Sequence, residues 1–278
     1  MTAPAHQRLP EAPRELWRTL SWVGLLALVA WSGLGLDARW ERLLDAPADL
    51  WNLAGLLFGD MAFDQTGSLL ADMWESIAIA WLGTIMAAVV AVPLSFFAAE
   101  NLAGRSTTFV VRQILNILRA IPEVILAIAF IPLLGLTPMA GVMAIALGSI
   151  GTLGKLFAEV TESISPDPIE AVDAVGGNRI QRLRWGVLPQ VLPEIASFVL
   201  YRFEINVRAS AVLGVIGAGG IGGTIAQTLQ FKAFDVAGLG LVIVVAATIG
   251  IDLVSGAVRR RILRGPSSGE HSASGGEH

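Results

Sequence analysis

Six apolar stretches, each long enough to cross a lipid bilayer, constrain the fold of this chain more than any other feature. The hydrocarbon core of a membrane is about 30 Å thick, and a helix needs about 20 apolar residues to cross it. Inside lipid, every backbone polar group must find a partner, so stretches of this length form helices. The sequence therefore predicts an all-α polytopic membrane protein with six transmembrane helices, at residues 17–36, 73–99, 109–134, 139–164, 191–216 and 236–258.

The chain carries too few charges for a protein that folds in water. Charged residues make up 15% of its 278 residues, whereas a soluble domain carries about 25%. Cysteine is absent, which excludes disulfides, thiol catalysis and cysteine metal sites. The three histidines, His6, His271 and His278, lie in the polar ends of the sequence. We therefore expect neither a metal site nor catalytic residues in the apolar stretches.

Lysine and arginine are unevenly distributed between the connections, and in short connections they mark the cytoplasmic side of a membrane. The connections after the first, third and fifth apolar stretches contain only Arg39, Arg42 and Lys232. The bias places both termini in the cytoplasm of a bacterium, with the chain in the inner membrane. The basic connections contain Arg8, Arg14, Arg18, Arg105, Arg112, Lys155, Arg179, Arg182, Arg184, Arg259, Arg260, Arg261 and Arg264.

These features divide the chain into three parts. Residues 1–68 are expected to contain the N-terminal tail, the first transmembrane helix and an outer interfacial segment. That segment is the apolar stretch 50–58, which is too short to span and lies between Asp49 and Asp60. Residues 69–264 are expected to form the main transmembrane domain. Residues 265–278 are rich in Ser and Gly and are expected to be disordered.

A polar segment, EAVDAVGGNRIQRLRWGVLP at residues 170–189, separates the fourth and fifth apolar stretches. Asp167 is expected to cap a short helix, with Glu170 three positions on as in a capping box. Gly176 and the glycine after it should end this helix after about two turns. An amphipathic stretch at 179–188 then leads to Pro189. The segment is therefore predicted to protrude from the membrane as an ordered handle for a soluble partner, although a connector without a partner remains the alternative.

Within this segment, Glu170-Ala171, Gly176 and Leu188-Pro189 resemble the EAA loop of type I ABC-importer permeases. The resemblance implies that the loop at 165–190 contains a coupling helix, which docks in a groove of a cytoplasmic ATPase. Two positions depart from the family pattern. Val172 stands in place of the second Ala, and Gly186 stands where Ile is usual and is expected to loosen the second half of the loop.

The resemblance extends over residues 75–263 and is to the phosphonate/phosphate-transport branch of these permeases. Methionine and glycine-betaine permeases are similar to this chain at GAGGIG (217–222), so they remain alternatives. The resemblance implies a permease subunit that forms the membrane path for phosphonate- or phosphate-type oxyanions. The segments that carry it are SIAIAWLGT (76–84), RAIPEV (119–124), GKLFAE (154–159), YRFE (201–204) and GAGGIG (217–222).

ATP hydrolysis is expected on a separate chain. A P-loop needs a glycine five positions before its Gly-Lys-Ser/Thr, and around Gly154-Lys155 the required positions hold Ser149 and Leu156. The family resemblance then implies four kinds of partner: an ABC ATPase dimer that binds ATP and Mg²⁺, an extracytoplasmic substrate-binding protein, a second copy of this chain and membrane lipid. Nucleic acid is not expected as a partner.

Charged and amide side chains inside the apolar stretches are the candidates for the translocation path, since such groups avoid lipid and tend to face a cavity or a partner. Arg119 and Glu123 are four residues apart, as are Glu204 and Arg208, and this spacing places each pair on one helix face. Structural pairing that neutralises the charges is the alternative to a polar path. The candidate path residues are Arg119, Glu123, Arg202, Glu204, Asn206 and Arg208.

The glycines of GAGGIG follow a transmembrane helix, so the dinucleotide-binding fingerprint that they match is not expected here. A flexible break near the outer end of the fifth span fits better, because glycine allows unusual backbone angles and close helix packing. Gly217, Gly219, Gly220 and Gly222 are therefore a candidate outer gate, and a plain helix end is the alternative. Pro122 lies within the third span and is expected to kink it.

Two other functional classes compete with an ATP-driven importer. A secondary transporter driven by an ion gradient would need inverted repeats, and no clear internal repeat is visible. A membrane enzyme would need a cluster of nucleophile, base or metal ligands, and the apolar stretches contain neither His nor Cys.

Overall fold

The computed structural model describes residues 15–35 and 42–263, and every regular element in these ranges is a helix. This agrees with the predicted all-α class. The chain divides into two compact units, Met1–Leu53 and Ala54–His278. The elements are α1 (Glu15–Gly35), α2 (Arg42–Phe58), η1 (Phe63–Gln65), α3 (Thr66–Ala98), α4 (Arg105–Ala120), α5 (Glu123–Leu134), α6 (Pro138–Glu162), α7 (Asp167–Ala174), α8 (Arg179–Gln181), η2 (Arg182–Val187), α9 (Leu188–Val215), α10 (Ile221–Gln230) and α11 (Phe234–Leu263).

The first unit contains α1 and most of α2. Helix α1 covers the first predicted span almost entirely, and the large apolar residues along it, such as Trp22 and Leu26, are exposed. Helix α2 is longer than the interfacial segment expected at 50–58, and it contains Pro47. Its location at the membrane surface stays a prediction. The predicted disordered tail at 265–278 lies outside the described residues.

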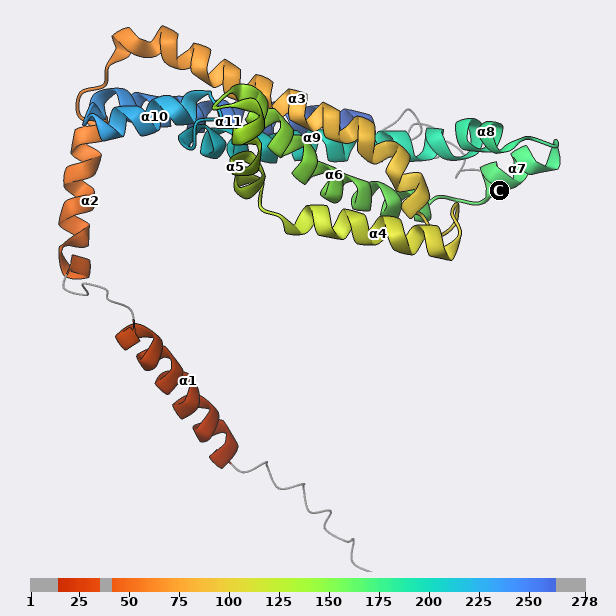
Figure 1. The fold of residues 1–278 in the computed structure, drawn as a ribbon, viewed down its shortest axis with the longest axis horizontal. Coiled ribbons are helices and arrows are strands. Elements are labelled where there is room, and N and C mark those ends of the chain that lie inside the picture. The colour runs from red at the N-terminus through yellow and green to blue at the C-terminus, as the bar shows by residue number, and fades with distance from the viewer. Residues whose placement is uncertain (1–14, 36–41, 264–278) are drawn as a thin grey trace, which may run out of the picture. The chain divides into compact units, whose positions relative to one another are not determined.

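The second unit is a bundle built around α3, α6 and α9 (Figure 1). Helix α3 packs on α6 through small residues at intervals of three and four, which lets the two backbones approach closely. A Cβ atom on Gly83 would lie 2.7 Å from the Cγ2 atom of Ile145, so this contact has no room for a larger side chain. Besides Gly83, the buried small residues of α3 are Ser76, Ala80, Thr84, Ala87, Ala91, Ser95 and Ala98.

Within residues 15–35 and 42–263, three helices are long and apolar enough to cross a membrane by themselves. They are Phe63–Ala98, which joins η1 to α3, then Pro138–Glu162 and Phe234–Leu263. These match the predicted second, fourth and sixth spans. Helices α1 and α9 lie at the predicted first and fifth spans but are not among them. In α9, the charged residues of the middle part, Arg202, Glu204 and Arg208, lower the hydropathy. A count of six spans therefore stays a prediction.

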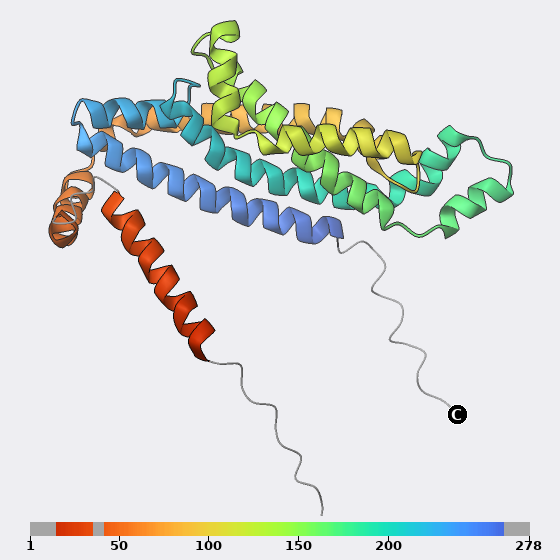
Figure 2. The same cartoon turned by 60° about the horizontal axis from the view of Figure 1, so that its bottom comes forward.

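The predicted third span is not one helix. Helices α4 and α5 meet at an angle of 87°, and the chain is extended at Ile121 and Pro122 between them. Proline has no backbone N–H to donate and pushes the residue before it away from helical angles. The kink expected at Pro122 is therefore confirmed, but it is a full break. In Figure 2, α5 projects sideways from the bundle while α4 runs along it.

Candidate coupling loop and buried polar network

The coupling loop, residues 165–190, projects from the end of the bundle at which α6 ends and α9 begins (Figure 1). Its first helix, α7, does not begin as expected. Asp167 already belongs to the helix, Pro166 is the N-cap residue, and the carbonyl of Pro166 accepts the Glu170 N–H at 2.9 Å. The predicted capping box at Asp167 and Glu170 is therefore wrong.

A capping box does form further along, at the start of α8. The Asn178 side chain accepts the backbone N–H of Gln181 at 2.9 Å, and the Gln181 side chain accepts that of Asn178 at 2.8 Å. Between the two helices, Gly176 has a φ of 75°, an angle that side-chain-bearing residues rarely adopt. The predicted stop at Gly176 is thus confirmed.

The two arms of the loop brace each other. Gly186 is buried against α7, and a Cβ atom on it would lie 3.0 Å from the Cγ1 atom of Ile169. The expectation that Gly186 loosens the loop is therefore wrong, because the missing side chain allows η2 to approach α7. Arg182 also donates from Nη2 to Asp173 at 2.6 Å.

Gln190 ties the base of the loop together. It donates to the Gly186 carbonyl at 2.7 Å and to the Ser165 carbonyl at 3.2 Å, and it accepts the Ser165 N–H at 3.1 Å. The loop is therefore held at its base and along its arms, as a rigid handle requires.

The outer surface of the coupling loop leaves apolar side chains in solvent. Val175, Ile180 and Trp185 are 83%, 76% and 63% exposed. Glu170, Ala171 and Pro189 are exposed as well, and Leu188 is half-buried. An exposed apolar patch rimmed by polar residues marks an interaction surface.

Four helices contribute to a buried polar network, defined by Thr84, Glu123, Ser149, Arg202 and Asn206. Asn206 donates to the Thr84 hydroxyl at 2.8 Å and to the Ser149 hydroxyl at 3.0 Å. Arg202 donates to Ser149 at 3.0 Å and forms an ion pair with Glu123. Three of the six candidate path residues thus lie together, and their polar groups are satisfied inside the protein.

The predicted pairing of Arg119 with Glu123 on one helix face is wrong. The break at Pro122 places Arg119 at the end of α4 and Glu123 at the start of α5, where it contacts Arg202. Among the residues that the structure describes, the Arg119 side chain forms no ion pair or hydrogen bond, and it is exposed. Proline, not the four-residue spacing, decides this geometry.

Glu204 and Arg208 are held by α11. Buried Glu204 accepts from Arg259 at 2.8 Å, while Arg208 approaches Asp252 with 3.8 Å between Nη2 and Oδ1. Arg208 meets Glu204 only through the backbone, since its Nε atom donates weakly to the Glu204 carbonyl at 3.4 Å. Sequence reasoning missed Asp252 and Arg259. Their seven-residue spacing puts both on one face of the last helix, and this signal could have found them.

The glycines at 217–222 break the helix path as predicted. Gly217, Gly219 and Gly220 have φ angles of 96°, 79° and 72°. A Cβ atom on Gly222 would lie 1.7 Å from the carbonyl oxygen of Ala211, so α10 can pack against α9 only with glycine there. The chain then continues through α10 towards the end of the bundle where α3 begins (Figures 1 and 2).

Two α3 side chains, which sequence reasoning missed, hold the start of α10. Glu75 accepts the Gly220 N–H at 3.2 Å, and Ser76 accepts the Ile221 N–H at 3.0 Å. The turn is therefore anchored to α3, and its role as an outer gate stays a prediction.

Comparison with known proteins agrees with this architecture. A phosphite transport system permease protein of Stutzerimonas stutzeri is 37% identical over 252 residues, which cover 88% of this chain and 90% of that protein. A phosphate-import permease protein of Mycolicibacterium smegmatis is 37% identical over 203 residues, 72% of this chain, but the match spans only 38% of that longer protein.

A solved structure of the inward-facing MetNI methionine ABC transporter superposes with a TM-score of 0.64. It is 22% identical, and the match covers 73% of this chain and 99% of that one. At this identity the match concerns the fold, which is that of type I ABC-importer permeases. The family model described as "Binding-protein-dependent transport system inner membrane component" matches residues 91–265. The chain therefore belongs to the binding-protein-dependent inner membrane components, the multi-pass permease subunits of ABC importers.

Proposed function

We propose that this chain forms the membrane path of an ATP-driven importer for phosphorus oxyanions: phosphate, phosphite or phosphonates. The two relatives named above are permeases for phosphite transport and phosphate import, and both are 37% identical to this chain. The chain itself is the non-catalytic subunit, and ATP and Mg²⁺ bind to a separate ATPase dimer. An extracytoplasmic binding protein delivers the solute, and two copies of the chain, each with residues 69–264 as its transport domain, enclose the path. Both termini and the coupling loop face the cytoplasm.

The coupling loop is the observation that carries the proposal. It is braced by Arg182–Asp173, by Gln190 and by the close approach of Gly186 to Ile169. Its exposed Val175, Ile180 and Trp185 are suited to a soluble partner, because apolar side chains gain stability when a partner removes them from water. A braced loop transmits the closing motion of the ATPase pair to α6 and α9, the helices that it joins.

Uptake measurements test the proposed function. Membrane vesicles that contain this chain, its ATPase and its binding protein should accumulate labelled phosphate or phosphite when ATP is supplied. Methylphosphonate, phosphate and phosphite should compete, whereas methionine and glycine betaine should not. Accumulation that follows an ion gradient without ATP would instead assign the chain to the secondary transporters, and competition by methionine alone would overturn the substrate class.

A further inference from the structure

Helix α4 has two contrasting exposed faces. One is apolar, and on it Val110, Ile114 and Ile117 are 54%, 49% and 62% exposed. The other is polar, because four of its residues follow one another at intervals of seven, four and three, which keeps them on one side of a helix. We call this the polar face of α4; it consists of Arg105, Arg112, Asn116 and Arg119, with Gln113 at its edge.

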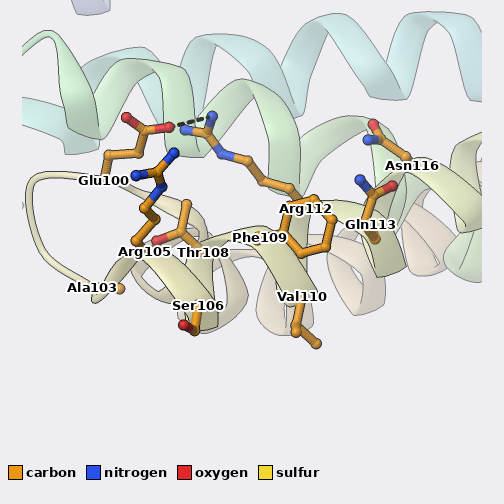
Figure 3. Close-up of a pocket in the computed structure, with 10 residues that line it drawn as sticks. All are labelled: Glu100, Ala103, Arg105, Ser106, Thr108, Phe109, Val110, Arg112, Gln113 and Asn116. Carbon is orange, nitrogen blue, oxygen red and sulfur yellow. Dashed lines mark hydrogen bonds and ion pairs between the residues drawn. The ribbon is translucent and has the colours of Figure 1, made fainter.

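The polar face borders a groove with a volume of about 920 Å³ (Figure 3). Figure 3 shows Arg105 and Arg112 reaching towards Glu100 at one end, and the amides of Gln113 and Asn116 at the other. A second cavity of about 360 Å³ shares Arg112 and Asn116 with the first and extends to residues of α6, Lys155 among them. We call the two together the cleft between α4 and α6. The first cavity is lined only by α4 and the connection before it, with Phe109 and Val110 among its apolar residues, and only the second reaches α6.

The lining of this cleft has spare hydrogen-bond donors. Its acidic groups are occupied, since Arg112 donates to Glu100 at 3.1 Å and pairs with Glu162, and Glu159 lies 3.7 Å from Lys155. Within the described part of the chain, the side chains of Arg105, Gln113 and Asn116 form no hydrogen bond or ion pair.

Thr108 also lines the groove. It is 2% exposed, and its hydroxyl has no partner among the described residues. A buried hydroxyl without a partner is unfavourable. The unpaired donors of Arg105, Gln113 and Asn116 can bind an oxyanion, which supplies acceptors and a negative charge at the same time.

The two faces of α4 need different surroundings in a membrane. Ile114 and Ile117 do not line the groove and are compatible with acyl chains, whereas a charged side chain in lipid is costly. Val110 lies at the boundary, since it also lines the groove. The cleft also lies next to the coupling loop, because a further cavity of about 550 Å³ joins Thr107, at the start of α4, to Arg182 and Leu183 of the loop. The polar face therefore borders water at the end of the bundle from which the loop projects.

We propose that the cleft between α4 and α6 is the water-filled part of the solute path next to the coupling loop, and that Arg105, Gln113 and Asn116 bind the passing oxyanion. This inference rests on the proposed function. It moves the solute contacts away from Arg202 and Asn206, whose donors are occupied in the buried polar network. The contacts on α4 come from exposed side chains in an open groove, so they bind weakly and allow release.

Cysteine labelling tests the proposal directly, because the natural chain has no cysteine. Gln113→Cys and Asn116→Cys, and Ile114→Cys as the control on the apolar face, are placed in the complete complex with ATPase and binding protein. A charged, membrane-impermeant thiosulfonate should label the first two at least about tenfold faster than the control, because a thiol ionises in water and not in lipid. Equal rates for Asn116→Cys and Ile114→Cys would overturn the proposal that water fills the cleft.

The charge of the reagent tests the role of Arg105. An anionic thiosulfonate should label Asn116→Cys faster than a cationic one, and Arg105→Gln should reduce this preference by about threefold to fivefold, the effect of one nearby charge in water. Phosphate, phosphite or methylphosphonate during ATP turnover should slow the labelling. Protection by the anionic lipid phosphatidylglycerol, and not by the three solutes, would assign the cleft to lipid headgroups and overturn the proposal.

The uptake assay separates the two levels of inference. If the unmodified complex imports none of the three anions, the proposed function fails before any cysteine is introduced. If it imports them while solute leaves the labelling of Gln113→Cys and Asn116→Cys unchanged, the proposed function stands and the assignment of the cleft fails.

Discussion

The buried polar network and the polar face of α4 both place arginine and asparagine within the helices of one bundle, but their partners differ. In the buried polar network, Arg202 and Asn206 are bound by Glu123, Ser149 and Thr84 from three other helices. On α4, Arg105 and Asn116 are exposed and bind no described residue. Side chains of the same type therefore have different roles. Those of the buried polar network fix how the helices pack, and those of the polar face of α4 are available to a solute.

Removal of the buried charge should have the largest effect on the fold. Arg202→Ala leaves the Glu123 carboxylate without its cation and should lower the free energy of unfolding by about 3–5 kcal/mol. Arg105→Ala, on the polar face, should change it by less than about 0.5 kcal/mol. Denaturant titration of the purified chain in detergent measures both. Equal losses would remove the contrast between the two regions.

Loss of the Asn206 amide should have the next largest effect on the free energy of unfolding. Asn206→Leu keeps the size of the side chain but leaves the buried Thr84 hydroxyl without its donor and Ser149 with Arg202 alone, so it should cost about 1–3 kcal/mol of unfolding free energy. Asn116→Leu is the matched change on α4 and should cost much less, because no described residue bonds to Asn116. If Asn116→Leu proved as damaging as Asn206→Leu, the polar face would hold an internal partner.

An exposed ion pair should matter less than the buried one. Asp173 and Arg182 are 40% and 42% exposed, and exposed pairs of this kind contribute about 0–1 kcal/mol. Asp173→Ala should therefore reduce the free energy of unfolding only slightly, and added salt should abolish the difference. A loss that persists in high salt would show that the coupling loop depends on this pair more than its exposure indicates.

Glu170→Lys should have the smallest effect on the fold and a large effect on assembly. Glu170 is exposed and forms no side-chain bond with a described residue, so unfolding should change by less than about 0.5 kcal/mol. Copurification of the ATPase and ATP-driven uptake should both fall. Asp64→Lys, an exposed change beside the start of α3, is the control. Normal copurification and uptake with Glu170→Lys would contradict the docking role of the loop.

Sequence patterns succeeded where one residue or a local run decides the structure. Gly176 ends α7 as predicted, and the glycines from Gly217 onwards break the path after α9, because a positive φ favours glycine wherever it occurs. Spacing failed where a break intervened. The interval from Arg119 to Glu123 indicates one helix face only in an unbroken helix, and the extended residues at 121–122 turn the two side chains apart.

The pairing of particular side chains from distant segments could not be predicted from the sequence. Gly186 looked like a weak point in the coupling loop, but its missing side chain is what allows η2 to lie against Ile169. The ion partners of Glu123 and Glu204, namely Arg202 and Arg259, lie 79 and 55 residues away along the chain. No local pattern specifies which of several charged residues will meet across a bundle.

The amino-acid sequence by itself determined the class of this protein: a helical membrane protein with a polar coupling loop of the ABC-importer type. It could do so because hydropathy, proline, glycine and the loop motif act locally, within one or two helical turns. The tertiary structure alone decided which polar side chains are satisfied and which remain free, since that depends on the distances between helices. The buried polar network and the polar face of α4 are composed of similar residues, and only their surroundings distinguish them.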